Sequence, residues 1–410
     1  MKKSRQTITL LMVVFFGFVG VALPYPVLSP LFLDPGATFL AAEYRHILLG
    51  LTLAAYPLAQ FFGSPILGSL SDSFGRRKLL ILTTLGTSFG YLLSGLAIAN
   101  NAIGLLIISR LLTGFLEGNM GIAQAGIADL GINKYKGLGA VSACASLGYV
   151  VGPLLGGFLS DQSSITWFNY AVPFYAASLI AFVLCLFVIM WFTETHTMRR
   201  KSRNLLAEFN VFTKLKSVYH KPALRKALLF MVLLSLSVDC YYEFYPAFLV
   251  EKWQMTSKLI GLYTVLLSFA LGVGAFFVPQ YLQKNKNVVG FQKYLLLIYL
   301  ISLLLLLFAN TSLGLNIHFI ILGLSYSITT TIQTVVISDN AMADEQGEVM
   351  GLQWGLRMLG DGSLCILGSL LLSQSYYFPI ILSMIIAGIS TCIAWNKRNV
   401  VGVSYAKSID

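Results

Sequence analysis

The chain has 410 residues, of which 57% are apolar and only 11% are charged, and its mean hydropathy is +0.77. These values lie far outside those of a soluble globular domain, so the composition indicates an integral membrane protein. The net charge of +11 is explained by basic loops that face anionic lipid headgroups, and no nucleic-acid partner is expected.

The hydropathy pattern predicts the membrane-spanning helices. A helix that crosses a bilayer needs roughly 20 mainly apolar residues. The sequence predicts twelve of them, at approximately 8–30, 46–70, 79–99, 103–128, 138–160, 166–193, 227–250, 258–282, 294–310, 316–338, 349–374 and 376–395. The first run is too long for a secretory signal peptide and lacks a convincing cleavage site, so we interpret it as the first helix. The expected fold class is an all-α membrane protein.

The basic residues predict the orientation. They concentrate in one set of connections, which includes both termini and the segment 199–226, whereas the opposite set holds only Arg45, Lys252 and Lys258. Because Lys and Arg near helix ends stay in the cytoplasm, both termini are expected there, in a multi-pass protein of the cell inner membrane.

One long polar interruption divides the helices six and six. It predicts an N-terminal six-helix bundle (1–193), a cytoplasmic linker (194–226) and a C-terminal six-helix bundle (227–410). Apolar residues of the linker recur at near-helical spacing, so it forms either an amphipathic helix on the inner leaflet or a solvated tether. Two bundles joined in this way suit alternating access around a site near the membrane midplane.

The connection between the second and third predicted helices carries a compact charged motif. Within GSLSDSFGRRK, the spacing G-x-x-x-D-x-x-G-R-R is formed by Gly68, Asp72, Gly75, Arg76 and Arg77. An aspartate at a helix end can face the positive N-terminus of another helix, a glycine permits a tight turn, and an arginine can pair with an acid. The expected partner of Arg76 is Asp129, in a latch that holds the cytoplasmic side closed. Alternatively, the basic residues only enforce topology.

Six charged residues fall inside predicted helices, where each costs about 2.5 to 3.5 kcal/mol and usually marks a pathway or a pair. They are Arg110, Glu117, Asp239, Glu243, Arg357 and Asp361. Arg357 and Asp361 are four residues apart and are expected to form an ion pair. Arg110 and Glu117 are two turns apart, so each is expected to face the cavity separately.

The acids in these helices are the candidates for proton coupling. Asp239 and Glu243 share a helix face without a basic neighbour in that helix, and two acids in a dry setting favour proton exchange. Glu117 and Asp361 are further candidates. Each acid could instead hydrogen-bond the substrate or serve as a buried structural partner.

Arginines and aromatic residues are the candidates for the substrate cavity. They are Arg110, Arg357, Tyr25, Tyr241 and Tyr242. Ring faces beside acids suit an amphipathic or cationic organic solute, although aromatic residues near a helix end also form interfacial belts.

A glycine and proline pattern occupies 139–157, GAVSACASLGYVVGPLLGG. Small residues four apart allow close helix approach, and an interior proline bends a helix. The residues concerned are Gly139, Gly148, Gly152, Pro153, Gly156 and Gly157.

Several of these segments resemble one known family. The motif at 68–77 is similar to the cytoplasmic signature loop of the major facilitator superfamily, and the pattern at 139–157 resembles the helix-5 signature of its drug/proton antiporters. Arg110 and Gly114 in SRLLTG match their helix-4 element. The stretches LSDSFGRRKLL, SRLLTGFLEGNMGIAQAGIADL, GYVVGPLLGG and YPAFLVEKWQMTSKLIGL resemble the tetracycline-exporter branch. Two departures stand out: Gly17 occupies the position where a helix-1 aspartate is expected, and Glu117 adds an acid in helix 4.

The resemblance implies the major facilitator fold and export of small organic molecules, such as drugs, in exchange for protons. An exporter of an endogenous metabolite such as a siderophore, and a proton-coupled nutrient importer, are the alternatives. No GxxxxGK[ST] loop occurs in the sequence, so no ATPase or other enzyme activity is expected. The scattered cysteines and histidines predict neither a metal site nor a cofactor, and the protein is expected to function as a monomer.

Overall fold

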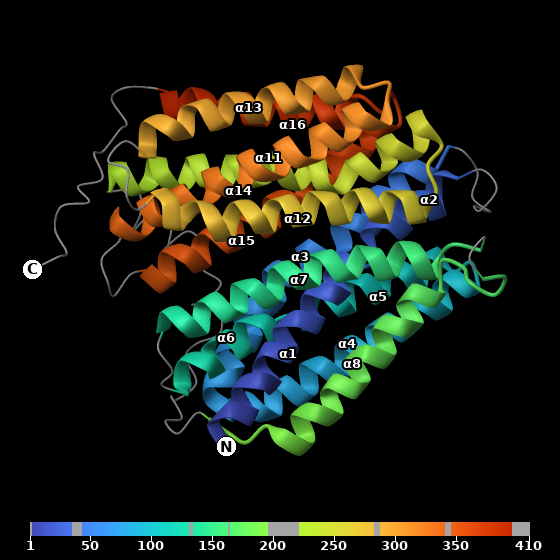
Figure 1. The fold of residues 1–410 in the computed structure, drawn as a ribbon. Helices are drawn as coiled ribbons and strands as arrows, with labels where there is room; N and C mark the ends of the chain where they lie inside the picture. Colours follow the sequence, from blue (N-terminus) through green and yellow to red (C-terminus); the bar gives the residue numbers. More distant parts are fainter. Residues whose placement is uncertain are drawn as a thin grey trace, which may run out of the picture.

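The computed structural model describes residues 2–34, 43–130, 134–162, 165–195, 221–282, 288–340 and 346–395, and within these ranges it is helical without strands (Figure 1). The N-terminal helices are α1 (Lys2–Ala22), α2 (Tyr25–Leu33), α3 (Arg45–Phe74), α4 (Arg76–Ala99), α5 (Ile103–Leu116), α6 (Asn119–Asp129), α7 (Lys134–Leu159) and α8 (Val172–Trp191). The C-terminal helices are α11 (Pro222–Trp253), α12 (Ser257–Leu282), α13 (Val288–Phe308), α14 (Ser312–Asn340), α15 (Gln346–Leu372) and α16 (Phe378–Trp395).

These helices account for the predicted membrane crossings. In the described part of the chain, 11 spans are long and apolar enough to cross a membrane. The remaining crossing is α7, within which the described part forms a shorter apolar segment, Ala143–Leu159. The prediction of an all-α membrane protein with twelve transmembrane helices is confirmed.

Two of the crossings are broken into two helices. The first breaks at Leu23 and Pro24, where proline removes a backbone N–H and α2 begins. The fourth breaks at Glu117 and Gly118, in a glycine-rich stretch with low helix propensity. The second break was not foreseen, because the hydropathy of residues 103–127 is continuous.

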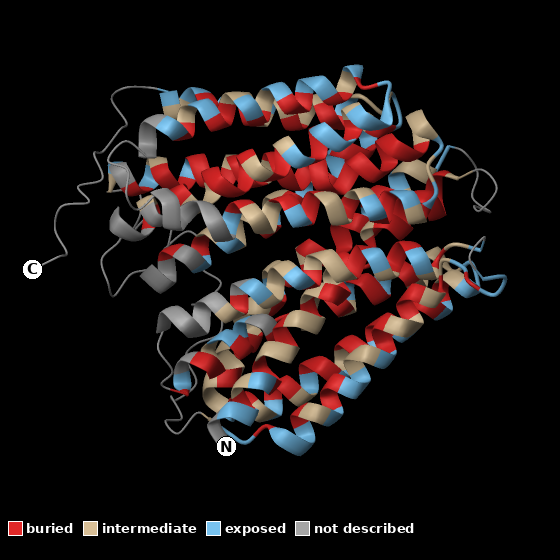
Figure 2. Ribbon diagram, in the orientation of Figure 1, coloured by how far each residue is buried: buried red, intermediate tan, exposed pale blue. Residues whose placement is uncertain are grey.

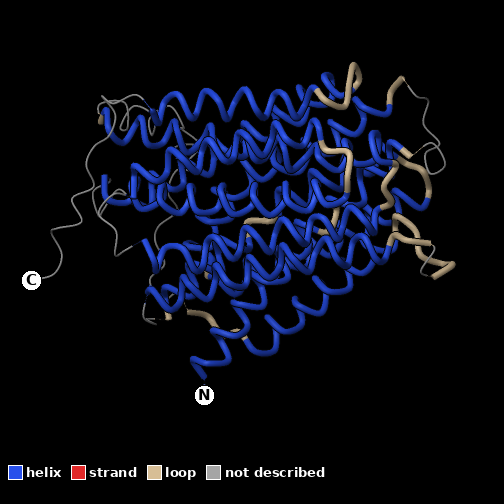
Figure 3. The backbone as a smooth tube through the Cα atoms, turned by 45° about the horizontal axis from the view of Figure 1, so that its top comes forward, coloured by secondary structure: helices blue, strands red, loops and turns tan. Residues whose placement is uncertain are grey.

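The helices form two six-crossing bundles, α1–α8 and α11–α16 (Figure 1). The bundles meet where α3 packs on α15, α7 packs on α12, and α2 packs on α11 and α12. Figure 1 shows the bundles diverging toward the face at which α1 begins, which we call the terminal face. Buried residues are concentrated between the helices, and exposed residues are spread over their outer sides (Figure 2). Loops gather at the opposite face (Figure 3).

The predicted linker falls largely outside the described residues, which resume at 221 after a gap at 196–220. α8 ends at Trp191, and α11 begins at Pro222 rather than at 227 because a proline is tolerated in the first helical turn. The amphipathic segment predicted within the linker lies outside the described residues.

Candidate functional site

A cavity lies between the two bundles, near the middle of the helices that line it. Its charged wall residues are Arg110, Asp239, Glu243, Arg357 and Asp361, and rings are supplied by Phe18, Tyr25, Tyr56, Tyr149 and Trp354. In this conformation it has room for only a few water molecules. Five charged groups from α5, α11 and α15 therefore meet in one narrow space at the interface of the bundles.

One arginine and one aspartate in this cavity form a two-pronged ion pair. Arg357 Nε lies 2.7 Å from Asp239 Oδ2, and Arg357 Nη2 lies 2.6 Å from Asp239 Oδ1. The expected pairing of Arg357 with Asp361 is therefore wrong. The planar guanidinium fork matches both carboxylate oxygens of an acid that faces it from α11, a geometry that a residue one turn away on the same helix does not offer. The negative charge of Asp239 is thereby balanced by the positive charge of Arg357.

Glu243 and Asp361 form the second charged group in this cavity. A carboxyl oxygen of each and the Cys365 thiol sulfur all lie within 4.8 Å of one another. Both acids are 8% exposed, and no salt bridge reaches either one among the described residues. Tyr25 lines the same cavity as both acids. Because two buried negative charges this close repel strongly, the arrangement favours binding of a proton or a cation between them.

Arg110 lines the same cavity as these acids and lies close enough to Glu243 to act on its charge, but it forms no salt bridge with them among the described residues. Its guanidinium carbon lies 4.7 Å from the centre of the Tyr56 ring, and the side chain is only 5% exposed. Nε and Nη1 have no hydrogen-bond partner among the described residues. A buried arginine stays charged, and Arg110 lines the cavity, so its guanidinium can attract an acidic group that enters the cavity.

Glu117 does not face the cavity between the bundles. It lies in a separate, smaller cavity inside the N-terminal bundle, together with Gly17, Tyr91 and Asn119. Arg110 and Glu117 thus face different cavities. Gly17, the position of the acid expected from the family resemblance, lines the same small cavity as the additional acid in helix 4.

The tyrosines separate into cavity and core residues. Tyr25 lines the cavity, and its ring centre lies 4.6 Å from that of Tyr242, which is held by a 3.2 Å hydrogen bond to Ser268. Tyr241 is fully buried, with its hydroxyl 2.8 Å from His318 Nε2. Neither Tyr241 nor Tyr242 is among the residues that line the cavity, and their burial in the protein core is incompatible with an interfacial belt.

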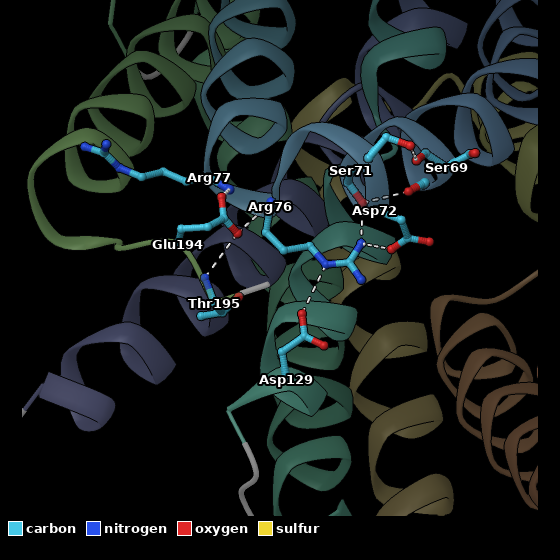
Figure 4. A network of polar contacts seen from close by, with 10 residues as sticks. Ser69, Ser71, Asp72, Arg76, Arg77, Asp129, Glu194 and Thr195 are labelled. Carbon is cyan, nitrogen blue, oxygen red and sulfur yellow. Dashed lines mark hydrogen bonds and ion pairs between the residues drawn. The ribbon is translucent and has the colours of Figure 1, made fainter. Parts of the chain in front are cut away.

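The motif between α3 and α4 forms a network at the terminal face (Figure 4). Arg76 Nη1 lies 2.6 Å from Asp72 Oδ1, and Arg76 Nε lies 3.2 Å from Asp129 Oδ2. The predicted contact of Arg76 with Asp129 is present, but it lies within the N-terminal bundle, so the expectation that this contact itself holds the two bundles closed is wrong. Gly75 has φ +99°, a left-handed conformation that favours glycine at the turn between the helices. A Cβ on Gly68 would meet nothing within 4 Å.

Glu194 completes this network and was not predicted from the sequence. Its Oε1 accepts the Arg76 backbone N–H at 2.9 Å, and its Oε2 accepts the Arg77 N–H at 3.1 Å (Figure 4). It therefore caps the positive N-terminal end of α4 from a segment 118 residues away. Only the tertiary fold brings it there.

The glycines of the 139–157 pattern lie at helix contacts. A Cβ at Gly148 would come 2.6 Å from Phe18 Cβ, and one at Gly152 would come 2.6 Å from the Val19 carbonyl oxygen. A Cβ at Gly156 would likewise collide with the backbone of Leu23. The surroundings of Gly139 lie outside the described residues. The close approach of α7 to α1 thus depends on glycines, which have no side chain to hold the helices apart.

The same helix also packs tightly across the bundle interface. A Cβ at Gly157 would come 2.6 Å from the Ser257 carbonyl oxygen and 3.2 Å from Gly261 Cα on α12. A Cβ at Gly261 would come 2.7 Å from the Pro153 carbonyl oxygen. Backbone meets backbone here, so the bundles are sealed between α7 and α12 on the side opposite the terminal face.

Two polar contacts between charged or titratable side chains cross the bundle interface on that side. His46 Nε2 lies 3.4 Å from Glu251 Oε1, and Lys258 Nζ lies 3.4 Å from Asp161 Oδ2. They link α3 to α11, and the end of α7 to α12. Together with the glycine contact, they hold the two bundles together at the face away from the termini.

The comparisons with known proteins agree with this architecture. The sequence profile of the Major Facilitator Superfamily matches residues 8–363, most of the chain. The chain belongs to the major facilitator superfamily. Its relatives in this superfamily include the class B tetracycline resistance protein of Escherichia coli, 34% identical over 218 residues, which are 53% of this chain and 50% of that protein. Multidrug resistance protein 2 of Bacillus subtilis is 25% identical over 97% of this chain and 98% of its own length.

This superfamily member therefore spans about half the length of the tetracycline resistance proteins that it matches. Among solved structures, the human organic anion transporter MFSD10 (TETRAN) has a TM-score of 0.69 at 18% identity and covers 96% of this chain and 100% of that one. The D-xylose-proton symporter has a TM-score of 0.72 at 12% identity, covering 97% and 98%. Both likenesses show the shared fold. The protein is a membrane-spanning member of this superfamily.

Proposed function

We propose that this transporter exports small organic molecules, including drugs, across the inner membrane in exchange for protons, by alternating access. The observation that carries the proposal is the buried Glu243–Asp361 pair, which lies in the cavity between the bundles without an ion-pair partner among the described residues. A group that gains and loses a proton at the point where cargo must pass is the minimum requirement for coupling.

The coupling follows from competition within one cavity. A cationic or amphipathic solute near Glu243 and Asp361 neutralises the charge that a proton would otherwise neutralise, so proton and solute exclude each other. The Tyr25, Tyr149 and Trp354 rings supply the faces for an organic cation. When the bundles open to the other side, protonation from that side displaces the solute.

The contacts between the bundles support a rocking movement. We infer that the terminal face is cytoplasmic, because Lys and Arg cluster in its connections, and that the halves 1–193 and 227–410 move about the linker 194–226. The interface is sealed at the opposite face by Gly157 and Gly261. Opening to the outside would break that seal. The Arg76–Asp72–Asp129 network joins α3, α4 and α6 within the N-terminal bundle, so it would act in cytoplasmic gating by holding these helix ends together as the bundle moves, not by bridging the two bundles.

The relatives support export rather than uptake. The tetracycline resistance proteins and multidrug resistance protein 2 are named for resistance, which drug export would explain. The likeness to a D-xylose-proton symporter concerns the fold alone and adds no support for a sugar importer.

Export of an acidic metabolite, such as a siderophore, is the second candidate function. It is favoured by Arg110, which lines the cavity without a salt bridge among the described residues and could bind a carboxylate of the cargo.

Everted membrane vesicles test the proposal. Acidified by respiration, they should release protons when a transported solute is added, and this release should disappear in Glu243→Gln. A panel of cationic dyes, tetracyclines and acidic chelators separates the two candidate cargo classes. Proton-independent accumulation of any cargo, with no other gradient present, would refute the coupling.

A further inference from the structure

The small cavity inside the N-terminal bundle contains a group of oxygen atoms that the transport cycle above does not use. Its walls come from α1, α4, α8 and the junction of α5 with α6. The polar wall residues are Thr84, Thr87, Tyr91, Glu117 and Asn119. The cavity admits an object of about the size of one water molecule, which is too small for any organic cargo.

The oxygens in this cavity are deeply buried and unsatisfied. Both carboxyl oxygens of Glu117, Oδ1 of Asn119 and the hydroxyl of Tyr91 have no hydrogen-bond partner among the described residues. The three residues are 1%, 2% and 2% exposed. The Asn119 amide is close enough to interact with the Glu117 carboxyl, but no contact to either carboxyl oxygen has the geometry of a hydrogen bond. Buried oxygens without a partner are costly, so a bound cation, a water molecule or a proton on Glu117 would each stabilise this group.

Backbone carbonyl groups at the end of α5 add negative electrostatic potential to this small cavity. α5 ends at Leu116, and the Glu117 N–H turns back to the Gly114 carbonyl at 3.3 Å, so carbonyls of the last turn of α5 have no helical N–H to pair with. The C-terminal end of a helix carries a partial negative charge. In transporters, broken membrane helices commonly hold coupling cations at their half-helix C-terminal ends.

The surrounding charges select a small monovalent ion. Glu117 supplies one negative charge, and Arg110 is the cation close enough to influence it. The Arg110 guanidinium packs on Tyr56 and lines the other cavity, with no salt bridge to Glu117 within the described residues. A divalent ion would need more negative charge than one carboxylate, and all-oxygen ligands suit a hard cation. We propose that Glu117, Asn119 and Tyr91 form a sodium-binding site within the N-terminal bundle, separate from the proton-coupling pair.

This site does not depend on proton exchange at Glu243 and Asp361, because it lies within one bundle and its oxygens come from other helices. Sodium there would tie α5 and α6 to α4, and so would stabilise the break in the fourth crossing. The site is therefore detectable by binding, whether or not transport is coupled to protons.

The test measures thermal unfolding of the purified full-length protein with sodium chloride, potassium chloride or choline chloride at constant ionic strength, together with ²²Na⁺ binding. We expect saturable stabilisation by Na⁺ but not by choline. Glu117→Gln removes the only charged ligand of the proposed site. It should weaken the apparent Na⁺ affinity by more than the roughly 10- to 100-fold that is typical when a residue that only supports a metal ligand is changed. Asn119→Ala, which keeps the carboxylate, guards against a folding defect and should also weaken binding.

The matched control is Asp361→Asn, which neutralises a buried acid in the other cavity and should leave Na⁺ binding intact. Three results would overturn the proposal: no Na⁺-specific effect in the natural protein, an undiminished effect in Glu117→Gln, or stabilisation that follows pH alone at every Na⁺ concentration. The last result would assign Glu117 to a proton instead.

Discussion

Removal of the Arg357 guanidinium should destabilise the C-terminal bundle by leaving Asp239 charged and uncompensated. The Asp239 side chain is 10% exposed and that of Arg357 is 26% exposed. Breaking one partner of a buried ion pair destabilises by 3 to 5 kcal/mol, and the partial exposure of Arg357 places Arg357→Gln at the low end, about 3 kcal/mol. Asp239→Asn in the same background removes the stranded charge and should recover about 2 kcal/mol of this loss.

The assay is a double-mutant cycle on the free energy of unfolding, measured by denaturant titration of the purified protein in detergent. A second cycle with Asp361→Asn is the control, because Asp361 is one turn from Arg357 on the same helix but makes no ion pair with it among the described residues. Its coupling energy should stay below about 1 kcal/mol. A larger coupling of Arg357 to Asp361 than to Asp239 would refute the assignment of the ion pair.

Three further predictions concern packing, the gating latch and the buried tyrosine. Gly157→Leu should push α7 away from α12 and expose the cavity to the outside. A cysteine introduced at Tyr25 would report this exposure by faster labelling with a membrane-impermeant thiol reagent. Gly104→Leu is the control, because a Cβ at Gly104 meets nothing within 4 Å, and equal labelling of the two variants would contradict the seal. Arg76→Ala should abolish transport at normal expression whereas Lys78→Ala should not, as measured by solute flux in vesicles; intact flux in Arg76→Ala would remove the latch. Tyr241→Phe should lower stability by about 1 kcal/mol through loss of the His318 hydrogen bond and leave cargo affinity unchanged, so a large loss of affinity would place Tyr241 in the cavity instead.

The membrane crossings could be predicted from the sequence because each is a long apolar run, and length alone distinguishes it from a soluble helix. The contact of Arg76 with Asp129 was also predictable, since opposite charges at the same end of neighbouring helices have few other partners. What the sequence could not supply was the choice between partners on different helices. Arg357 has an acid one turn away, Asp361, but it pairs with Asp239 because of the way α11 packs on α15.

The broken fourth crossing was missed for a related reason. Hydropathy averages over Glu117 and Gly118 and reports one continuous span, whereas the backbone breaks where a glycine-rich stretch meets a buried acid. A charged residue beside two glycines in an apolar run, here Gly114 and Gly118, was the available indication. Glu194 gave no such indication, because only the fold brings it to the start of α4.

The most direct test of proton coupling compares two transport modes in liposomes that contain the Glu243→Gln/Asp361→Asn protein. One is accumulation of cargo driven by a pH gradient, and the other is exchange of labelled for unlabelled cargo without any gradient. We predict that exchange continues, because the bundles still rock around bound cargo, while accumulation is lost. Full accumulation in this variant would contradict the assignment of coupling to the carboxyl pair.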